Sequence, residues 1–259
     1  MPPIIVSLTT VPRRLLDPID GNGIRPGLQT IVEQECSLPY EVHLNIPYSH
    51  NYARTVLPDW VPSWLEKYPH LKIFRCPDFG PITKIYPTIQ RVTDPETIII
   101  TVDDDLYYCP GFIEAHLRGR EKYPDCAIGY AGIHSIEPYG WHFATSVNVD
   151  MRVRMLEGYK TVSYKRSFFD DELDKFVFAH WNDDYSLGAY LGYKNIHKMV
   201  LAWEHDTDFS PRVESFPCIG HVPITGDRHA CNLFRDNTSI QASGEEVTGE
   251  WYKEHWLER

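Results

Sequence analysis

Three consecutive aspartates, Asp103, Asp104 and Asp105, directly follow an apolar run of β-forming residues at 98–102. A strand that is apolar on both faces lies in the interior of a sheet. Neighbouring carboxylates repel one another unless a cation or hydrogen bonds neutralise them. Because ligands of open α/β sheets bind at the carboxyl ends of the strands, we expect a divalent-cation site here, for Mg²⁺ or Mn²⁺. The alternative is helix capping, for which one aspartate would suffice.

A second acidic pair, Asp183 and Asp184, stands at the start of an apolar stretch that predicts a helix over 183–192. An alcohol is a poor nucleophile at neutral pH, and a positioned carboxylate that accepts its proton is the usual remedy. We therefore interpret this pair as a source of a general base. Asp184 is our first choice and Asp183 the second, because Asp183 could instead cap the helix.

Predicted strands and helices alternate along the N-terminal half of the chain and position these acids. Such alternation is typical of a parallel sheet built from right-handed crossovers. Strands are predicted at 4–8, 41–46, 71–75, 98–102, 126–131, 159–164 and 195–201, and helices at 26–35, 60–68, 83–92, 111–122, 170–178 and 183–192. After Glu204 the pattern becomes irregular. We predict an α/β fold with a mostly parallel sheet flanked by helices, in one domain over 1–259.

Composition excludes several classes of function. The chain has 259 residues and a formal net charge of −11, without a basic run, which argues against nucleic-acid binding. No apolar stretch is long enough for a membrane span. The first strand leaves no room for a signal peptide, so we expect a cytosolic protein or a domain excised from a longer one. The six cysteines are scattered singly, which favours reduced thiols over disulfides or a zinc site.

Three segments together resemble a known family, the glycosyltransferases with the GT-A fold. The strand that ends in Asp103-Asp104-Asp105 resembles their D-x-D motif. Residues 6–13, Val-Ser-Leu-Thr-Thr-Val-Pro-Arg, resemble the "S-L-T-T-x-P-x-R" opening of a subgroup of small transferases. Residues 78–84, Asp-Phe-Gly-Pro-Ile-Thr-Lys, resemble the "D-x-G-P-x-T-K" turn of that subgroup. The resemblance covers residues 4–110 well and the remainder loosely.

The resemblance implies a GT-A-like, Rossmann-type sheet with a nucleotide-binding half at 1–110 and an acceptor-side catalytic half at 111–259. It implies a nucleotide-sugar donor, usually UDP-linked, and a glycan or other hydroxyl acceptor. Asp105 would ligate the metal. Asp103 would contact the ribose or uridine and lie beside the metal, while Asp104 would be a neighbouring sugar contact. Inversion at the anomeric carbon is expected if Asp184 or Asp183 lies behind the sugar.

Further residues of these segments are candidates for holding the nucleotide. Thr9 and Thr10 lie where the first strand ends, and Arg13 or Arg14 would lie near the phosphates. Asp78 and Lys84 complete the set. Lys84 follows a Gly-Pro turn at a predicted helix N-terminus, where backbone N–H groups already favour an anion.

Histidines and aromatic residues of the C-terminal half supply weaker candidates. Some GT-A enzymes add a C-terminal histidine to the metal, and His229 is the candidate here, with His221 as a second choice. Two segments, Trp141-His142 and Trp203-Glu204-His205, could pack against a sugar, although core packing explains them equally well.

Two other functions would use part of the same pattern. A nucleotidyltransferase that makes nucleotide-sugars would usually carry a glycine-rich basic loop after the first strand, and residues 9–13 contain no glycine. A non-catalytic carbohydrate- or calcium-binding module is also possible. The alternating N-terminal half and the lack of a D-x-D-x-D-G loop argue against it.

Overall fold

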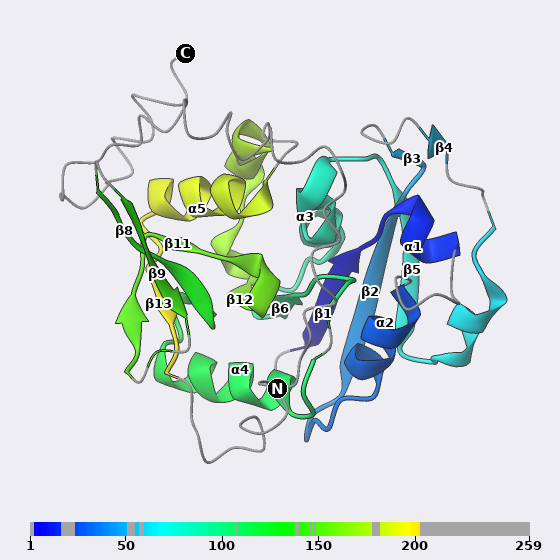
Figure 1. Cartoon of the computed structure of the whole chain (residues 1–259), viewed down its shortest axis with the longest axis horizontal. Coiled ribbons are helices and arrows are strands. Elements are labelled where there is room, and N and C mark those ends of the chain that lie inside the picture. Colours follow the sequence, from blue (N-terminus) through cyan, green and yellow to red (C-terminus); the bar gives the residue numbers. More distant parts are fainter. Residues whose placement is uncertain are drawn as a thin grey trace.

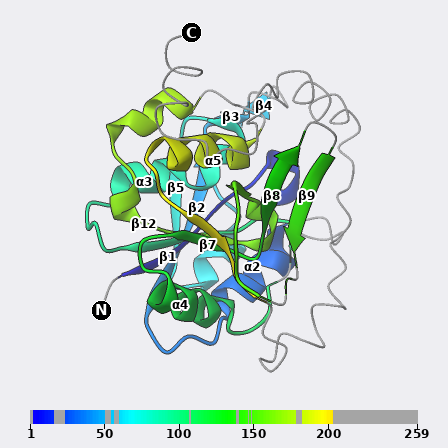
Figure 2. The same ribbon diagram turned by 90° about the vertical axis from the view of Figure 1, so that its left-hand side faces the viewer.

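The structure of the protein is a computed structural model. It describes residues 3–16, 24–50, 55–56, 60–106, 108–137, 140–145, 147, 149–177 and 182–202. Figures 1 and 2 show a central mixed sheet with α4 on one side and α3 and α5 on the other. This arrangement confirms the predicted α/β class.

The main sheet has eight strands in the order β10-β13-β7-β12-β6-β1-β2-β5. Strands β1, β2, β5 and β6 run parallel to one another, as predicted. Strand β12 is inserted antiparallel between β6 and β7, so the sheet is mixed but mostly parallel. The strand bounds are β1 Ile4–Thr9, β2 Tyr40–Pro47, β5 Leu71–Cys76, β6 Ile98–Thr101, β7 Ala127–Gly129, β10 Met151–Arg152, β12 Val162–Lys165 and β13 Lys198–Val200.

The helices divide between the two faces of this sheet. Helices α1, α2 and α4 share a core with β1, β2 and β6, while α3 and α5 pack on the opposite face. The strand alternation explains this division, since Ile98 and Ile100 enter the first core and Ile99 enters the second. The helix bounds are α1 Pro12–Leu16, α2 Ile24–Val32, α3 Tyr86–Arg91, α4 Phe112–Lys122 and α5 Asp183–Tyr193.

Shorter elements complete the fold. Five 3₁₀ helices occur, η1 Ser63–Lys67, η2 Gly80–Lys84, η3 Gly158–Lys160, η4 Arg166–Phe168 and η5 Asp171–Phe176. A second sheet has the order β11-β8-β9, and a third pairs β3 with β4. Their bounds are β3 Ser49–His50, β4 Thr55–Val56, β8 Ala131–Glu137, β9 Gly140–Thr145 and β11 Met155–Leu156.

Parallel pairing brings the carboxyl ends of β1 and β6 to one edge of the sheet. Ser7 of β1 lies opposite Thr101 of β6, so the residues that follow each strand are neighbours. Strand β12 is antiparallel to β6 and pairs Val162 with Thr101, so the first residues of β12 lie at this same edge. The edge therefore collects the residues after β1, the residues after β6 and the 3₁₀ helix η3.

Several predicted elements differ from the structure. The predicted helices at 60–68 and 170–178 are the 3₁₀ helices η1 and η5 in the described residues. The predicted strand at 126–131 ends at Gly129, and the hairpin β8–β9 that follows was not predicted. The predicted strand at 159–164 begins at Val162, because the 3₁₀ helix η3 takes up the preceding residues.

Two expectations from composition concern cysteines and membranes. Cys36, Cys76, Cys109 and Cys126 are free thiols, as expected, and the other two cysteines lie outside the described residues. Within the part of the chain that the structure describes, no helix has the length and apolar character needed to cross a bilayer.

Candidate active site

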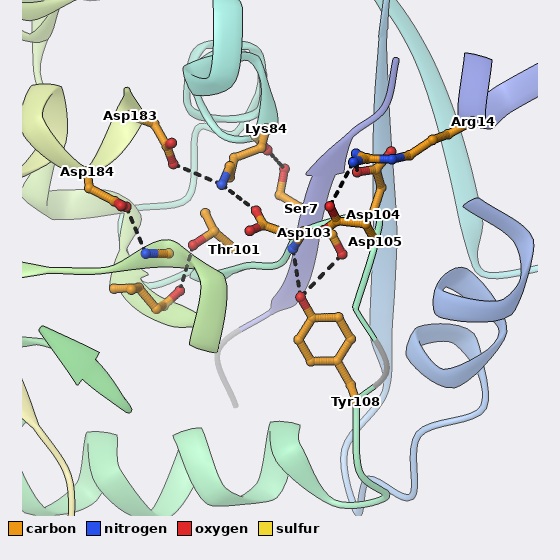
Figure 3. A network of polar contacts seen from close by, with 12 residues as sticks. Ser7, Arg14, Lys84, Thr101, Asp103, Asp104, Asp105, Tyr108, Asp183 and Asp184 are labelled. Carbon is orange, nitrogen blue, oxygen red and sulfur yellow. Dashed lines mark hydrogen bonds and ion pairs between the residues drawn. The ribbon is translucent and has the colours of Figure 1, made fainter. Parts of the chain in front are cut away.

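Lys84, the last residue of η2, lies between the two acidic segments. Its Nζ is 2.5 Å from Asp103 Oδ1 and 3.0 Å from Asp183 Oδ2 (Figure 3). Only 8% of the lysine side chain is exposed. Burial opposes its charge, but Asp103, Asp183 and Asp184 outweigh burial and raise the pKa of Lys84. The ammonium therefore stays charged and joins the acids after β6 to those at the start of α5.

A buried polar network fixes the backbone of Lys84. The Ser7 hydroxyl donates to the Lys84 carbonyl at 2.5 Å, and the Asn45 amide donates to the same carbonyl at 3.3 Å. Ser7 and Asn45 also contact the Thr88 hydroxyl. Strands β1 and β2 thus hold the Lys84 carbonyl directly, and Thr88 of α3 supports both donors, which restricts where the lysine side chain can reach.

Asp104 is the most buried of the three consecutive aspartates. It accepts a hydrogen bond from the Thr10 hydroxyl at 2.5 Å and pairs with Arg14 at 2.5 Å. Burial raises the pKa of Asp104 to about 6, although Arg14 and Thr10 oppose the shift. These contacts join the turn after β6 to the segment after β1, so Asp104 supports the structure of the site.

Asp103 and Asp105 are the more accessible members of the run. Their side chains are 26% and 24% exposed. Asp105 pairs with the other nitrogen of Arg14 at 2.7 Å. The backbone N–H of Asp103 donates to the Tyr108 hydroxyl at 2.7 Å, which holds the turn in place (Figure 3).

The acids of α5 differ in their partners. Asn182 is the N-cap, because its side chain accepts from the Tyr185 N–H, so Asp183 is not needed as a cap. Asp183 is buried against Lys84. Asp184 is half-buried and accepts the backbone N–H of Gly158 at 2.7 Å. Burial and the neighbouring Asp183 raise the pKa of Asp184.

The charge balance of these groups fits a divalent cation. Within the described residues five carboxylates face two cations, Lys84 and Arg14. No three His, Cys, Asp or Glu side chains of the described part are grouped as a ready-made metal site. Mg²⁺ does not require one, since it is commonly held by one or two carboxylates together with substrate phosphates and water. Asp103 and Asp105 offer such oxygen donors.

The predicted residues separate into three groups. The structure brings together Thr10, Arg14, Lys84, Asp103, Asp104, Asp105, Asp183 and Asp184. The hydroxyl of Thr9 instead donates to the Asn45 carbonyl in the sheet, and Asp78 accepts locally from the Gly80 N–H. The side chains of Arg13, Trp141 and His142, and all of Trp203, His205, His221 and His229, lie outside the described residues.

Sequence reasoning missed three contributors to the site. Tyr108 holds the turn after β6, and Gly158 contacts Asp184. Asn45 supports the Lys84 carbonyl. None of them carries a recognisable local signal, since a tyrosine, a glycine and an asparagine in these settings also suit ordinary packing and turns.

Comparison with solved structures supports the fold. The structure of GalNAc-T7 with UDP, GalNAc and Mn²⁺ matches with a TM-score of 0.52 and 10% identity, over 76% of this chain and 41% of that one. The structure of S. aureus TarS 1–349 with UDP-GlcNAc matches with a TM-score of 0.47 and 14% identity, over 76% of this chain and 55% of that one. This chain therefore spans about half the length of these two proteins. The fold is α/β and GT-A-like.

A third solved structure is similar at a comparable level. It is 4-diphosphocytidyl-2C-methyl-D-erythritol synthase, with a TM-score of 0.45 and 9% identity, over 74% of this chain and 86% of that one. No protein-family model and no curated protein matches the sequence.

Proposed function

We propose that the protein is a metal-dependent glycosyltransferase that moves a sugar from a nucleoside-diphosphate sugar, UDP-linked, to a hydroxyl acceptor with inversion. One observation carries the proposal: Lys84 joins the acidic turn after β6 to the acidic start of α5. The reaction needs both a cationic environment for a departing diphosphate and a base for the incoming hydroxyl. The two acidic segments are adjacent although they lie far apart in the sequence.

The turn after β6 is the donor side. Asp103 and Asp105 would hold Mn²⁺ or Mg²⁺, and the bound cation would offset the charge that develops on the diphosphate. Thr9, Thr10, Arg13 and Asp78 are the remaining nucleotide-binding candidates. Lys84 supports this role because it is a buried, charged group beside Asp103. His229 remains a candidate additional ligand.

The start of α5 is the acceptor side, and Asp184 is the better candidate for the base. Lys84 neutralises Asp183 at 3.0 Å, whereas Asp184 accepts a hydrogen bond from the uncharged N–H of Gly158. Asp184 would take the hydroxyl proton as the acceptor oxygen bonds to the anomeric carbon. The bond from that carbon to the diphosphate oxygen breaks, and its electron pair leaves with the diphosphate.

A screen of nucleotide-sugars tests the proposal. The purified chain is incubated with UDP- and GDP-sugars and Mn²⁺, and release of the nucleoside diphosphate is measured with and without simple sugar acceptors. We expect slow Mn²⁺-dependent release from one donor, lost in Asp105→Ala and retained in Asp171→Ala, which removes an exposed aspartate of η5. A binding module would release none, and a nucleotidyltransferase would instead form pyrophosphate-linked products from a nucleoside triphosphate.

A further inference from the structure

Gly158 lies where the charged groups of the site converge. It is buried in η3, and its N–H donates to Asp184 Oδ1 at 2.7 Å. A Cβ atom at this position would lie 3.0 Å from Asp184 Oδ1, 3.3 Å from Lys84 Nζ and 3.4 Å from Asp183 Oδ2. A side chain at this position would therefore meet both acids of α5 and Lys84, which joins Asp183 to Asp103.

Backbone conformation does not explain why this residue is a glycine. Among the described glycines, positive φ angles occur at Gly80 and Gly111 and not at Gly158. An alanine could adopt the backbone of Gly158 without the strain of the left-handed region. What a side chain would meet is the cluster of charged atoms, so the position is restricted by space.

The framework around η3 is tied to elements other than α5 as well. The Glu157 N–H donates to the Ala131 carbonyl at 3.0 Å, and the Thr161 N–H donates to the Gly158 carbonyl at 3.0 Å. Thr161 has a φ of 66°, and its hydroxyl contacts the buried ring of His116 on α4. A non-glycine residue in this conformation persists where its surroundings fix it. Elements other than α5, namely β8 and α4, thus help to fix the donor.

We propose that Gly158 is a positioning residue for the general base: its N–H orients the Asp184 carboxylate toward the acceptor, and its missing side chain leaves the room in which Asp184 lies beside Asp183 and Lys84. This inference rests on the proposed glycosyltransferase activity. The hydrogen bond engages one oxygen of Asp184 and leaves the other to accept the hydroxyl proton. Lys84 meanwhile engages Asp183. Gly158 and Lys84 together give two adjacent aspartates different tasks.

The first test reads the contact without any turnover. Protein labelled with ¹⁵N-glycine shows resonances from its 16 glycines, and the Gly158 signal is the one missing from Gly158→Ala. At pH 8 we expect the Gly158 amide proton to move upfield in Asp184→Ala, because a bond to a carboxylate is lost. It should stay in place in Asp171→Ala. If the chemical shift of the Gly158 amide proton does not change in Asp184→Ala, the proposal is overturned, whatever the protein catalyses.

The second test separates positioning from folding. Gly158→Ala should lower kcat at least tenfold, and about a hundredfold if the carboxylate moves by about 1 Å, with the donor KM unchanged. Gly188→Ala is the matched control, since its Cβ on α5 would meet only the flexible side chain of Met155, at 3.0 Å. It should keep kcat. A Gly158→Ala enzyme with wild-type kcat, or equal losses in both variants, overturns the proposal.

The two tests distinguish the inference from the function on which it rests. If the wild type transfers no sugar while the Gly158 resonance responds to Asp184→Ala, the proposed function and the catalytic role of Gly158 both fail. The hydrogen bond itself would then stand as a structural contact. If the wild type transfers sugar and the resonance does not respond, the function stands and the positioning role fails.

Discussion

Replacing Lys84 with methionine removes the cation between two buried acidic segments and nearly preserves the side-chain volume. Lys84 is 8% exposed and pairs with Asp103 at 2.5 Å and Asp183 at 3.0 Å. Removing one partner of a buried ion pair costs about 3–5 kcal/mol, because the other charge stays buried without compensation. For a chain of this size 1 kcal/mol corresponds to about 2–4 °C, so we expect the Tm to fall by roughly 6–20 °C.

The loss should depend on pH in a defined direction. Asp103, Asp183 and Asp184 raise the pKa of Lys84 in the folded state despite burial. The stabilisation by Lys84 is therefore fully present below the pKa of an unfolded lysine, and it is lost only as the pH rises through the folded pKa. Burial and Asp183 raise the pKa of Asp184, so toward acid pH this carboxyl takes up a proton and its attraction to Lys84 is lost. The difference in Tm between wild type and variant should be largest near pH 8 and narrow toward pH 4.

Thermal unfolding of both proteins at several pH values measures this effect. Lys122→Met is the matched control, because Lys122 also lies 2.5 Å from an aspartate, Asp150, but its side chain is 64% exposed. Solvent screens such a pair, so its loss should hardly change the Tm. A Lys84→Met protein as stable as the wild type, or a loss of Tm that does not change with pH, would show that Lys84 does not neutralise the two acidic segments.

Three further predictions concern other parts of the structure. Burial, together with the neighbouring Arg120, lowers the pKa of His116 to about 3. At pH 5 this histidine therefore binds a proton only in the unfolded state, so the wild type should lose about 2 kcal/mol of stability between pH 7 and pH 5. Urea unfolding should show no such loss in His116→Gln. A Cβ at Gly27 would lie 2.6 Å from the Leu106 carbonyl oxygen and 3.2 Å from that of Asp104, so calorimetry should find about 10- to 100-fold weaker Mn²⁺-dependent UDP binding in Gly27→Ala, and unchanged binding would contradict this. Asp184→Asn should lower kcat by about 10²- to 10⁴-fold with UDP binding intact. Because burial and Asp183 raise the pKa of Asp184, the wild-type kcat should fall on acidification at a pH above the ordinary range of aspartate pKa values. A pH profile of kcat that is flat down to pH 4 would exclude Asp184 as the base.

The sequence predicted those parts of the fold that depend on local pattern. The apolar runs at β1 and β6 and the alternation at β2 are properties of single segments, and the parallel half of the sheet follows from their order. The antiparallel insertion of β12 next to β6 could not be predicted, because the irregular stretch before it gives no register. The hairpin β8–β9 was missed for the same reason.

The candidate site was predictable as residue types but not as an arrangement. Aspartate runs after a core strand and before a helix are visible in the sequence, whereas their meeting at Lys84 depends on tertiary packing. The sequence left open whether Asp183 caps α5, and the structure gives the cap to Asn182. Gly158 could not be identified, because only the folded chain shows that a side chain there would enter the charged cluster.

Calorimetric titration of UDP into the protein, with Mn²⁺ and with a chelator, shows whether the turn after β6 binds a nucleotide through a metal ion. We expect binding that requires Mn²⁺ and is lost in Asp105→Ala, whose stability should be preserved because Asp105 is one of the more exposed acids of the site. UDP binding that is equally strong in chelator, or that survives Asp105→Ala unchanged, would contradict the assignment of the turn after β6 as a metal-assisted nucleotide site.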